Sequence, residues 1–310
     1  MKINILFPGQ GAQFVGMGLD FYALYPRYRE IVDAASAAAK LDLKSVVEDA
    51  EKLQETSHAQ LAIFTMSYGI ASLLQDEGLS FSHTLGLSLG EYGALTLAGA
   101  LNFEDTVALL KVRSDAMQKA SQENPGFLAA VSFLDREKVE EALAGKEGIW
   151  ISNYNAPNQT VVGGALFAKE IFEESMKAAG AKKVTYLQVS GAFHTALMTS
   201  AGERFQEAVQ KVPVMMPKVP VLSNLKGDFY QVGDDMASIL TQHIYSPVRL
   251  DLCLEKLEAK EGDLHLLLGP GKALASILKQ NKILGEVLVV NTVEDFEKTM
   301  TIIKEKQHEQ

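Results

Sequence analysis

A short strand, a sharp turn and a helix are predicted in succession around Ser88, and this unit is the strongest constraint on the fold. The turn reads Gly86-Leu87-Ser88-Leu89-Gly90, with an apolar run at 84–87 and a helical stretch to about residue 97. A G-x-S-x-G turn in this setting raises the serine hydroxyl at the edge of an α/β sheet. The first N–H groups of the helix then favour negative charge nearby. Ser88 is therefore a candidate nucleophile; alternatively it only caps the helix, with Glu91 completing a capping box.

The remaining pattern alternates between short apolar runs and longer helical stretches, as in α/β proteins. Ile3–Phe7 is predicted to be a buried strand because it is apolar and ends at Pro8-Gly9. The polar segment Lys304–Gln310 is expected to be frayed. Further helices are predicted at 21–41, 59–77, 104–122, 195–210, 234–242, 250–260 and 272–280, and further strands at 219–223, 264–268 and 286–290.

The middle of the chain has a different order of elements. After Gly126 the predicted order is β-α-β-β-α-β, which is the split βαβ pattern of a ferredoxin-like unit. We therefore expect a large α/β subdomain formed by 1–123 and 191–310, into which a ferredoxin-like subdomain, 124–190, is inserted. The predicted elements of this insertion are 127–134, 136–144, 149–155, 159–163, 168–179 and 183–189.

Composition excludes several classes of function. The net charge of −10 argues against nucleic acid as a partner, since phosphate binding needs a basic face. The single cysteine, Cys253, excludes an internal disulfide and a multi-cysteine metal site. No stretch approaches the ~20 apolar residues of a membrane span, and the apolar run at 3–7 is too short for a signal peptide. A cytoplasmic protein without a membrane partner is expected.

A serine nucleophile needs a base, because its hydroxyl is unreactive at neutral pH. Of the six histidines, His194 lies in Ser190-Gly191-Ala192-Phe193-His194, where the inserted unit returns to the large one. Loops at such junctions often carry function. His194 is the candidate base; the alternative is a structural, hydrogen-bonded histidine.

A glycine-rich turn after the first strand is the third element. The carboxyl ends of neighbouring strands gather ligands in an α/β sheet, so this turn and Ser88 can lie side by side. The backbone N–H groups of Gln10 and Leu89 would then suit an oxyanion hole. Alternatively the glycines only form a turn. They are no dinucleotide fingerprint, because G-x-G-x-x-G is absent.

Together these motifs resemble those of the malonyl-CoA:acyl-carrier-protein transacylases and the related acyltransferase domains of polyketide synthases, nearly over the whole chain. The residues that carry the resemblance are Pro8-Gly9-Gln10-Gly11-Ala12-Gln13, Gly86-Leu87-Ser88-Leu89-Gly90-Glu91-Tyr92, Arg113, Ala192-Phe193-His194, Tyr245-Ser246-Pro247-Val248 and Gly269-Pro270-Gly271-Lys272. The resemblance implies an α/β-hydrolase-like large subdomain with the ferredoxin-like insertion, and an active site between them.

The resemblance also assigns the site. Ser88 matches the nucleophile and His194 the base, while Gln10 and Leu89 match the residues whose N–H groups hold the oxyanion. The substrate-binding positions that it implies are Arg113, Phe193, His243 and Asn155.

Arg113 matches the arginine that pairs with the malonyl carboxylate, for which a guanidinium fork is suited. The alternative for Arg113 is a residue on the surface of a helix. Phe193 matches a position where phenylalanine accompanies malonyl specificity, and Asn155 one near the substrate.

Two positions depart from the family pattern. Leu87 stands where the family usually has histidine, and His243 stands where it often has glutamine. The backbone carbonyl at the latter position orients the catalytic histidine, so a changed side chain need not break the pair. No Asp or Glu is assigned as a third triad member.

The implied reaction is ping-pong transfer of malonyl from malonyl-CoA to the phosphopantetheine thiol of acyl carrier protein, supplying fatty-acid synthesis. Malonyl-CoA is a substrate, phosphopantetheine belongs to the partner protein, and neither cofactor nor metal is expected. Three alternatives remain: a discrete acyltransferase serving a polyketide synthase, a serine esterase or thioesterase, and a non-catalytic subunit that binds carrier protein.

Overall fold

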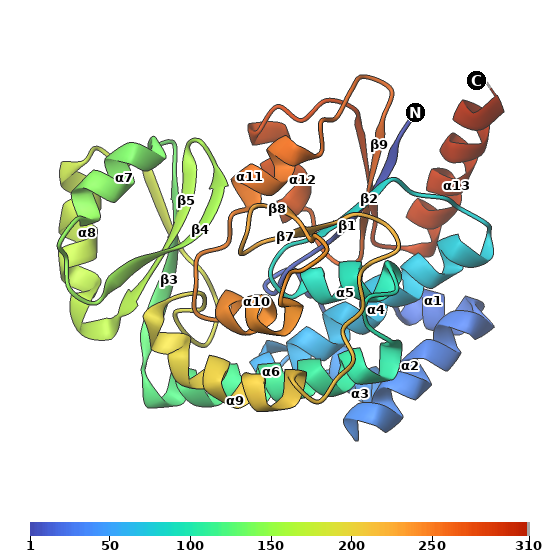
Figure 1. Ribbon diagram of the computed structural model, residues 1–310, viewed down its shortest axis with the longest axis horizontal. Coiled ribbons are helices and arrows are strands. Elements are labelled where there is room, and N and C mark those ends of the chain that lie inside the picture. The colour runs from blue at the N-terminus through green and yellow to red at the C-terminus, as the bar shows by residue number, and fades with distance from the viewer. Residues whose placement is uncertain (309–310) are drawn as a thin grey trace.

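The computed structural model describes residues 1–308, which form two β-sheets with helices packed around them (Figure 1). The larger sheet has the strand order β10-β9-β1-β2-β7-β8 and is parallel except for β8. Its strands are β1 (Ile3–Phe7), β2 (His83–Gly86), β7 (Val221–Ser223), β8 (Asp228–Phe229), β9 (Leu264–Leu268) and β10 (Glu286–Val290).

Helices cover both faces of this sheet. No helix within residues 1–308 is long and apolar enough to cross a membrane. The α-helices of this part are α1 (Leu19–Leu24), α2 (Pro26–Ala39), α3 (Leu43–Glu48), α4 (Thr56–Asp76), α5 (Gly90–Leu97), α6 (Phe103–Glu123), α9 (Thr199–Val209), α10 (Met236–His243), α11 (Leu250–Lys256), α12 (Ala273–Gln280) and α13 (Val293–His308). Two short 3₁₀ turns, η1 (Lys52–Gln54) and η3 (Ala196–Met198), accompany them.

The central strand β1 is buried on both faces, as its largely apolar sequence predicts, and its one polar side chain, Asn4, is buried too. Because side chains alternate along a strand, Ile5 and Phe7 join the core formed with α2, α4, α5 and α6. Leu6 joins a second core on the opposite face, with Leu254 of α11 and Leu278 of α12. The site is therefore built on a strand that two hydrophobic cores hold in place.

The strand order brings the predicted site loops together. β1 lies between β2 and β9, and its last residue, Phe7, is in register with Gly86 of β2. The chain runs from β1 to β2 and β7, then crosses back to β9 and β10 on the other side of β1. Ligands of open α/β sheets bind where the strand order reverses in this way. The prediction that the turn after β1 lies beside Ser88 is confirmed.

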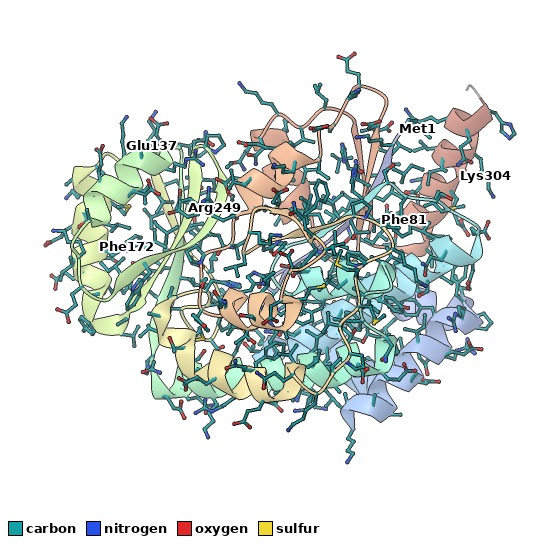
Figure 2. All side chains as sticks on the ribbon, viewed as in Figure 1. Met1, Phe81, Glu137, Phe172, Arg249 and Lys304 are labelled. Carbon is teal, nitrogen blue, oxygen red and sulfur yellow. The ribbon has the colours of Figure 1, made fainter. Side chains whose placement is uncertain are left out.

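The smaller sheet is antiparallel and has the order β4-β5-β3-β6. With one helix after β3 and one after β5, this is the ferredoxin-like arrangement that the sequence predicts. Figure 2 labels Phe172 of α8, which is fully buried in the core of this unit. Its elements are β3 (Gly126–Ser132), α7 (Arg136–Leu143), β4 (Ile149–Ala156), β5 (Gln159–Ala165), η2 (Leu166–Ala168), α8 (Lys169–Ala178) and β6 (Lys183–Tyr186).

The predicted fold class, an α/β-hydrolase-like unit with a ferredoxin-like insertion, is confirmed. The exact division at 124 and 190 stays a prediction.

The two sheets meet along β4. The backbone N–H of Tyr154 donates to Val248 O at 2.9 Å, and the N–H of Val248 donates to Ser152 O at 2.9 Å. The Arg249 guanidinium lies over the Tyr154 ring, 4.6 Å from its centroid, and Figure 2 labels Arg249 beside the small sheet. Backbone pairing and a cation–π contact thus orient the small sheet relative to the large one.

One predicted helix is interrupted. The helix predicted at 21–41 is two helices, α1 and α2, because Tyr25 is extended with φ −110° and ψ 107°. Proline disfavours a helical conformation in the residue before it, and its fixed φ suits the first position of a helix. Pro26 therefore ends one helix and begins the next.

The expectation of a frayed C-terminus is wrong for 304–308, which belong to α13; residues 309–310 lie outside the described part. The capping-box pattern of Thr292 and Asp295 marks the start of α13: the Thr292 N–H donates to Asp295 Oδ2 at 3.1 Å, and the Asp295 N–H donates to Thr292 Oγ1 at 3.2 Å. Phe296, Met300 and Ile303 are buried at helical spacing. The helix was therefore readable from the sequence.

We expect Gly90→Ala to lower the free energy of unfolding by about 3 kcal/mol, because a Cβ there would lie 2.3 Å from Phe7 O. Urea denaturation measures this change. Gly78→Ala is the control: its φ is 77° and nothing lies within 4 Å of the added Cβ, so about 1 kcal/mol of strain is expected. Equal losses in the two variants would contradict the steric argument.

Candidate active site

The turn between β2 and α5 holds Ser88 in a left-handed conformation, with φ 52°. A Cβ at Gly86 would lie 1.8 Å from the carbonyl carbon of Gly90, so the turn closes too tightly for any other residue there. Helix α5 begins at Gly90, and Leu89 is its N-cap. The alternative that Ser88 only caps the helix is wrong, because its hydroxyl contacts His194 and Arg113 instead.

Asn224 stabilises this turn from the neighbouring strand. The N–H of Ser88 donates to Asn224 Oδ1 at 2.6 Å, and Asn224 Nδ2 donates to Gly86 O at 2.8 Å. One buried amide thus holds the backbone of the turn at Gly86 and at the nucleophile itself. Sequence reasoning missed Asn224. The available signal was a polar residue directly after β7, the strand beside β2 in the sheet.

The Ser88 hydroxyl and the His194 ring form the predicted pair. Ser88 Oγ lies 2.6 Å from His194 Nε2. His194 Nδ1 lies 2.7 Å from the backbone oxygen of His243. Because a carbonyl only accepts, Nδ1 carries the proton and Nε2 presents its lone pair to the serine hydroxyl. The carbonyl of His243 takes the orienting place that an acid occupies in a Ser-His-Asp triad.

His194 is buried, and its backbone has a left-handed φ of 59°. Its N–H donates to Ile244 O at 3.2 Å, so the C-terminal end of α10 fixes both the backbone and the ring. Burial, and next the charge of Arg113, lower the pKa of His194 to about 3. The imidazole is therefore neutral at physiological pH, as a base that takes a proton must be.

Arg113 of α6 is almost fully buried, at 1% exposure, so the alternative of a surface helix residue is wrong. Its Nη2 donates to Ser88 Oγ at 3.1 Å, and its Nη1 donates to Gln60 Oε1 at 2.7 Å. Within residues 1–308 no carboxylate pairs with this guanidinium, and its buried Nε has no acceptor. A buried charge without a counter-ion is unfavourable unless a ligand supplies one.

The predicted oxyanion donors lie on two adjacent loops. Gln10 follows β1, Leu89 follows Ser88, and the two loops are adjacent because β1 pairs with β2. In the described part of the chain, neither backbone N–H donates to a protein acceptor. Both donors are thus available to a negative oxygen bound at Ser88.

A cleft of about 540 Å³ opens over Ser88 and His194, between the large and the small sheet. Phe193 and Asn155 line it, as predicted for substrate-binding residues. Asn155 Nδ2 donates to Gln159 Oε1 at 3.3 Å, while its buried Oδ1 has no partner within residues 1–308. The predicted site residues other than His243 therefore lie in or against one cleft.

Comparison with known proteins agrees with this geometry. The family model described as "Acyl transferase domain" matches residues 5–267. The malonyl CoA-acyl carrier protein transacylase of Bacillus subtilis is 34% identical, and the match covers 98% of each chain. The chain belongs to the malonyl-CoA:acyl-carrier-protein transacylase family.

Solved structures of the family have the same fold. The malonyl CoA-acyl carrier protein transacylase of Clostridium perfringens superposes with a TM-score of 0.92 at 34% identity, over 99% of this chain and 98% of that one. A malonyl-transacylase in complex with its type II PKS acyl-carrier protein superposes with a TM-score of 0.89 at 29% identity, over 96% and 98%. The likeness extends over both sheets of the enzyme.

In this transacylase the ring of His243 does not line the cleft. It stacks behind His194, with ring centroids 4.9 Å apart, and its Nδ1 lies 3.3 Å from Glu91 Oε2. Glu91 is fully buried, accepts from the Tyr230 hydroxyl at 2.6 Å, and accepts from the Asn224 N–H at 3.1 Å. Burial raises the pKa of Glu91 to about 7. The transacylase thus has a second buried layer that sequence reasoning did not find.

We expect Glu91→Gln to change how stability depends on pH. The unfolded chain ionises Glu91 near pH 4.5, whereas burial keeps it neutral up to about 7. Its contribution to the free energy of unfolding is complete below pH 4.5 and is lost as pH rises through 7, about 3 kcal/mol in all. Relative to the wild type, the variant should therefore gain about 2 kcal/mol between pH 5 and pH 8.

Chemical denaturation of both proteins at the two pH values measures this gain. Burial lowers the pKa of both His194 and His243, so both stay neutral in the folded protein between pH 5 and pH 8 and their contributions cancel in the comparison. Parallel pH dependences would show that Glu91 is already ionised in the folded enzyme at pH 5.

Proposed function

We propose that this enzyme transfers malonyl from malonyl-CoA to the phosphopantetheine thiol of acyl carrier protein, through a malonyl ester on Ser88. One observation carries the proposal: the buried, unpaired guanidinium of Arg113 donates to the hydroxyl that also contacts His194. A malonyl group places its carboxylate one methylene from the carbonyl that Ser88 attacks. The 3.1 Å between Arg113 Nη2 and Ser88 Oγ matches so short an acyl group. A cation there favours malonyl over the uncharged acetyl.

In the first half-reaction, Ser88 Oγ attacks the thioester carbonyl while its proton moves to His194 Nε2. The N–H groups of Gln10 and Leu89 stabilise the oxygen on which negative charge develops. The carbon–sulfur bond then breaks, and His194 returns the proton to the sulfur, so coenzyme A leaves as a thiol. Ser88 keeps the malonyl group as an ester.

In the second half-reaction, the phosphopantetheine thiol gives its proton to His194 and attacks the ester. The bond to Ser88 Oγ breaks, and His194 returns the proton to that oxygen. The Nδ1–H···O bond to His243 keeps the ring in the same tautomer through both halves. The malonyl carboxylate stays on Arg113 throughout, which keeps the ester carbonyl near the oxyanion donors.

This reaction needs no cofactor or metal beyond the thioesters themselves. The relatives whose names include acyl carrier protein, and the complex with a carrier protein, support such a protein as the acceptor. We place the enzyme in the cytoplasm, where it would supply malonyl units to fatty-acid synthesis. Phe193 and Asn155, which line the cleft, would contact the acyl group and the pantetheine arm.

Intact-mass spectrometry after mixing with malonyl-CoA tests the proposal. We expect one malonyl adduct on the wild type, its discharge by holo acyl carrier protein, and no adduct on Ser88→Ala. Acetyl-CoA in a parallel reaction should load Ser88 far more slowly. Absence of a malonyl adduct on the wild type would contradict the covalent scheme, and rapid release of free malonate would indicate a hydrolase.

The pH dependence of loading tests the role of His194. Only the neutral imidazole accepts a proton, and its pKa is lowered to about 3, so the rate of malonyl loading should stay roughly constant from pH 8 down to about 5. Single-turnover loading by quenched mass spectrometry measures it. Arg113→Met removes a charge that lowers this pKa. The acid limb of the rate profile of this variant, measured with acetyl-CoA, should therefore lie at higher pH. A wild-type rate that falls about tenfold per unit below pH 6.5 would contradict the low pKa.

A further inference from the structure

The side chain of Gln60 connects the two parts of the site that bind negative charge: Arg113 and the loop of Gln10. Gln60 lies in the first turns of α4 and is 1% exposed. Its Oε1 accepts from Arg113 Nη1 at 2.7 Å, and its Nε2 donates to Gln10 Oε1 at 3.2 Å. The side chain of Gln60 thus touches both the guanidinium and the loop that carries an oxyanion donor.

Both acceptors of Arg113 are electrically neutral. They are the amide oxygen of Gln60 and the hydroxyl of Ser88. A carboxylate at position 60 would have the same shape and would make the same contact, but it would neutralise the guanidinium. In proteins a buried arginine usually has such a partner, because an uncompensated buried charge is costly. A neutral acceptor therefore fixes the guanidinium in place without giving it a directly bonded counter-ion.

We propose that Gln60 is a specificity-determining residue: its neutral amide holds Arg113 without neutralising it, and so reserves the guanidinium for the carboxylate of the acyl group. This inference rests on the proposed function and extends it to a residue that does not line the cleft. Selectivity for malonyl over acetyl then depends on two residues, the cation Arg113 and the uncharged Gln60 that holds it. The substrate carboxylate completes an ion pair that the protein leaves open.

The same amide positions the oxyanion loop. Arg113 only donates, so Gln60 must turn its oxygen to the guanidinium and its NH₂ group to Gln10. Gln10 Nε2 in turn donates to Thr56 Oγ1 at 2.9 Å, and that hydroxyl lies 2.9 Å from Ser190 Oγ. A hydrogen-bonded chain therefore runs from the carboxylate site through the oxyanion loop to the segment that precedes His194. A substitution at Gln60 should therefore affect both the carboxylate site and the oxyanion loop.

The substitution Gln60→Glu tests the proposal. An internal carboxylate would pair with Arg113 and compete with malonyl, so kcat/KM for malonyl loading should fall at least about tenfold, mainly through KM. Acetyl loading should also slow, because a carboxylate at position 60 no longer donates to Gln10, but it should slow less than malonyl loading, because the neutral acetyl group does not use the guanidinium. The measured quantity is the ratio of kcat/KM for malonyl-CoA to that for acetyl-CoA, from the Ser88 adducts. A wild-type ratio in Gln60→Glu would overturn the proposal.

Gln60→Met is the control, because it removes both hydrogen bonds of the Gln60 side chain without adding charge. It should slow loading from both thioesters and keep the preference for malonyl within a few-fold of the wild type. Loss of the preference in this variant would also overturn the proposal, since hydrogen bonding rather than neutrality would then set it. Thermal unfolding and the acetyl adduct check that each variant is folded.

The experiments distinguish a failure of the proposed function from a failure of the role given to Gln60. If the wild type forms no malonyl ester, both proposals fail. If it does, only the ratios in the two variants decide the role of Gln60.

Discussion

The conformation of Ser88 is the constraint on which the rest of the site depends. A residue with a side chain is strained at φ 52°, and a strained backbone persists only where its surroundings determine it. Here the side chain of Asn224 bonds to Gly86 O and to the Ser88 N–H, and the close approach of Gly86 and Gly90 leaves no space to relax. The hydroxyl therefore meets His194 and Arg113 at fixed distances, and neither partner has to reorganise before the reaction begins.

A neighbouring positive charge controls the basicity of the catalytic histidine. Arg113 is the second cause, after burial, of the low pKa of His194. A carboxylate bound to Arg113 would offset that charge and raise the basicity of the imidazole. The correct substrate would thus improve the base that activates the nucleophile, whereas an uncharged acyl group would not. Behind His194, Glu91 contacts His243, and burial raises the pKa of this carboxyl to about 7.

The sequence predicts those parts of the site that short patterns encode. Some features depend only on residues that are close in the sequence: the strand at 3–7, the turn at 86–90 and the order of elements at 124–190. Periodicity and turn residues therefore predict the fold class of the chain and the place of Ser88. Arg113, Phe193 and Asn155 are recognisable only through the family resemblance, because one arginine on a helix resembles any other. The roles of Gln60, Asn224 and Glu91 do not follow from the sequence, because their partners are 53, 136 and 139 residues away in the chain. A polar residue directly after a strand, such as Asn224, is a candidate, but only the fold shows what its side chain contacts.

The two chain segments that connect the small sheet to the large subdomain lie next to each other. A Cβ at Gly191 would lie 2.2 Å from Ser121 Oγ, and one at Gly126 would lie 2.9 Å from the Cβ of Ala192. Both crossings of the chain are therefore side by side, at the end of α6. A segment with adjacent ends can be exchanged as a cassette during evolution without disturbing the strands that hold Ser88. One wall of the cleft can then diverge to suit new carriers or acyl chains, while the chemistry on the other wall is inherited unchanged.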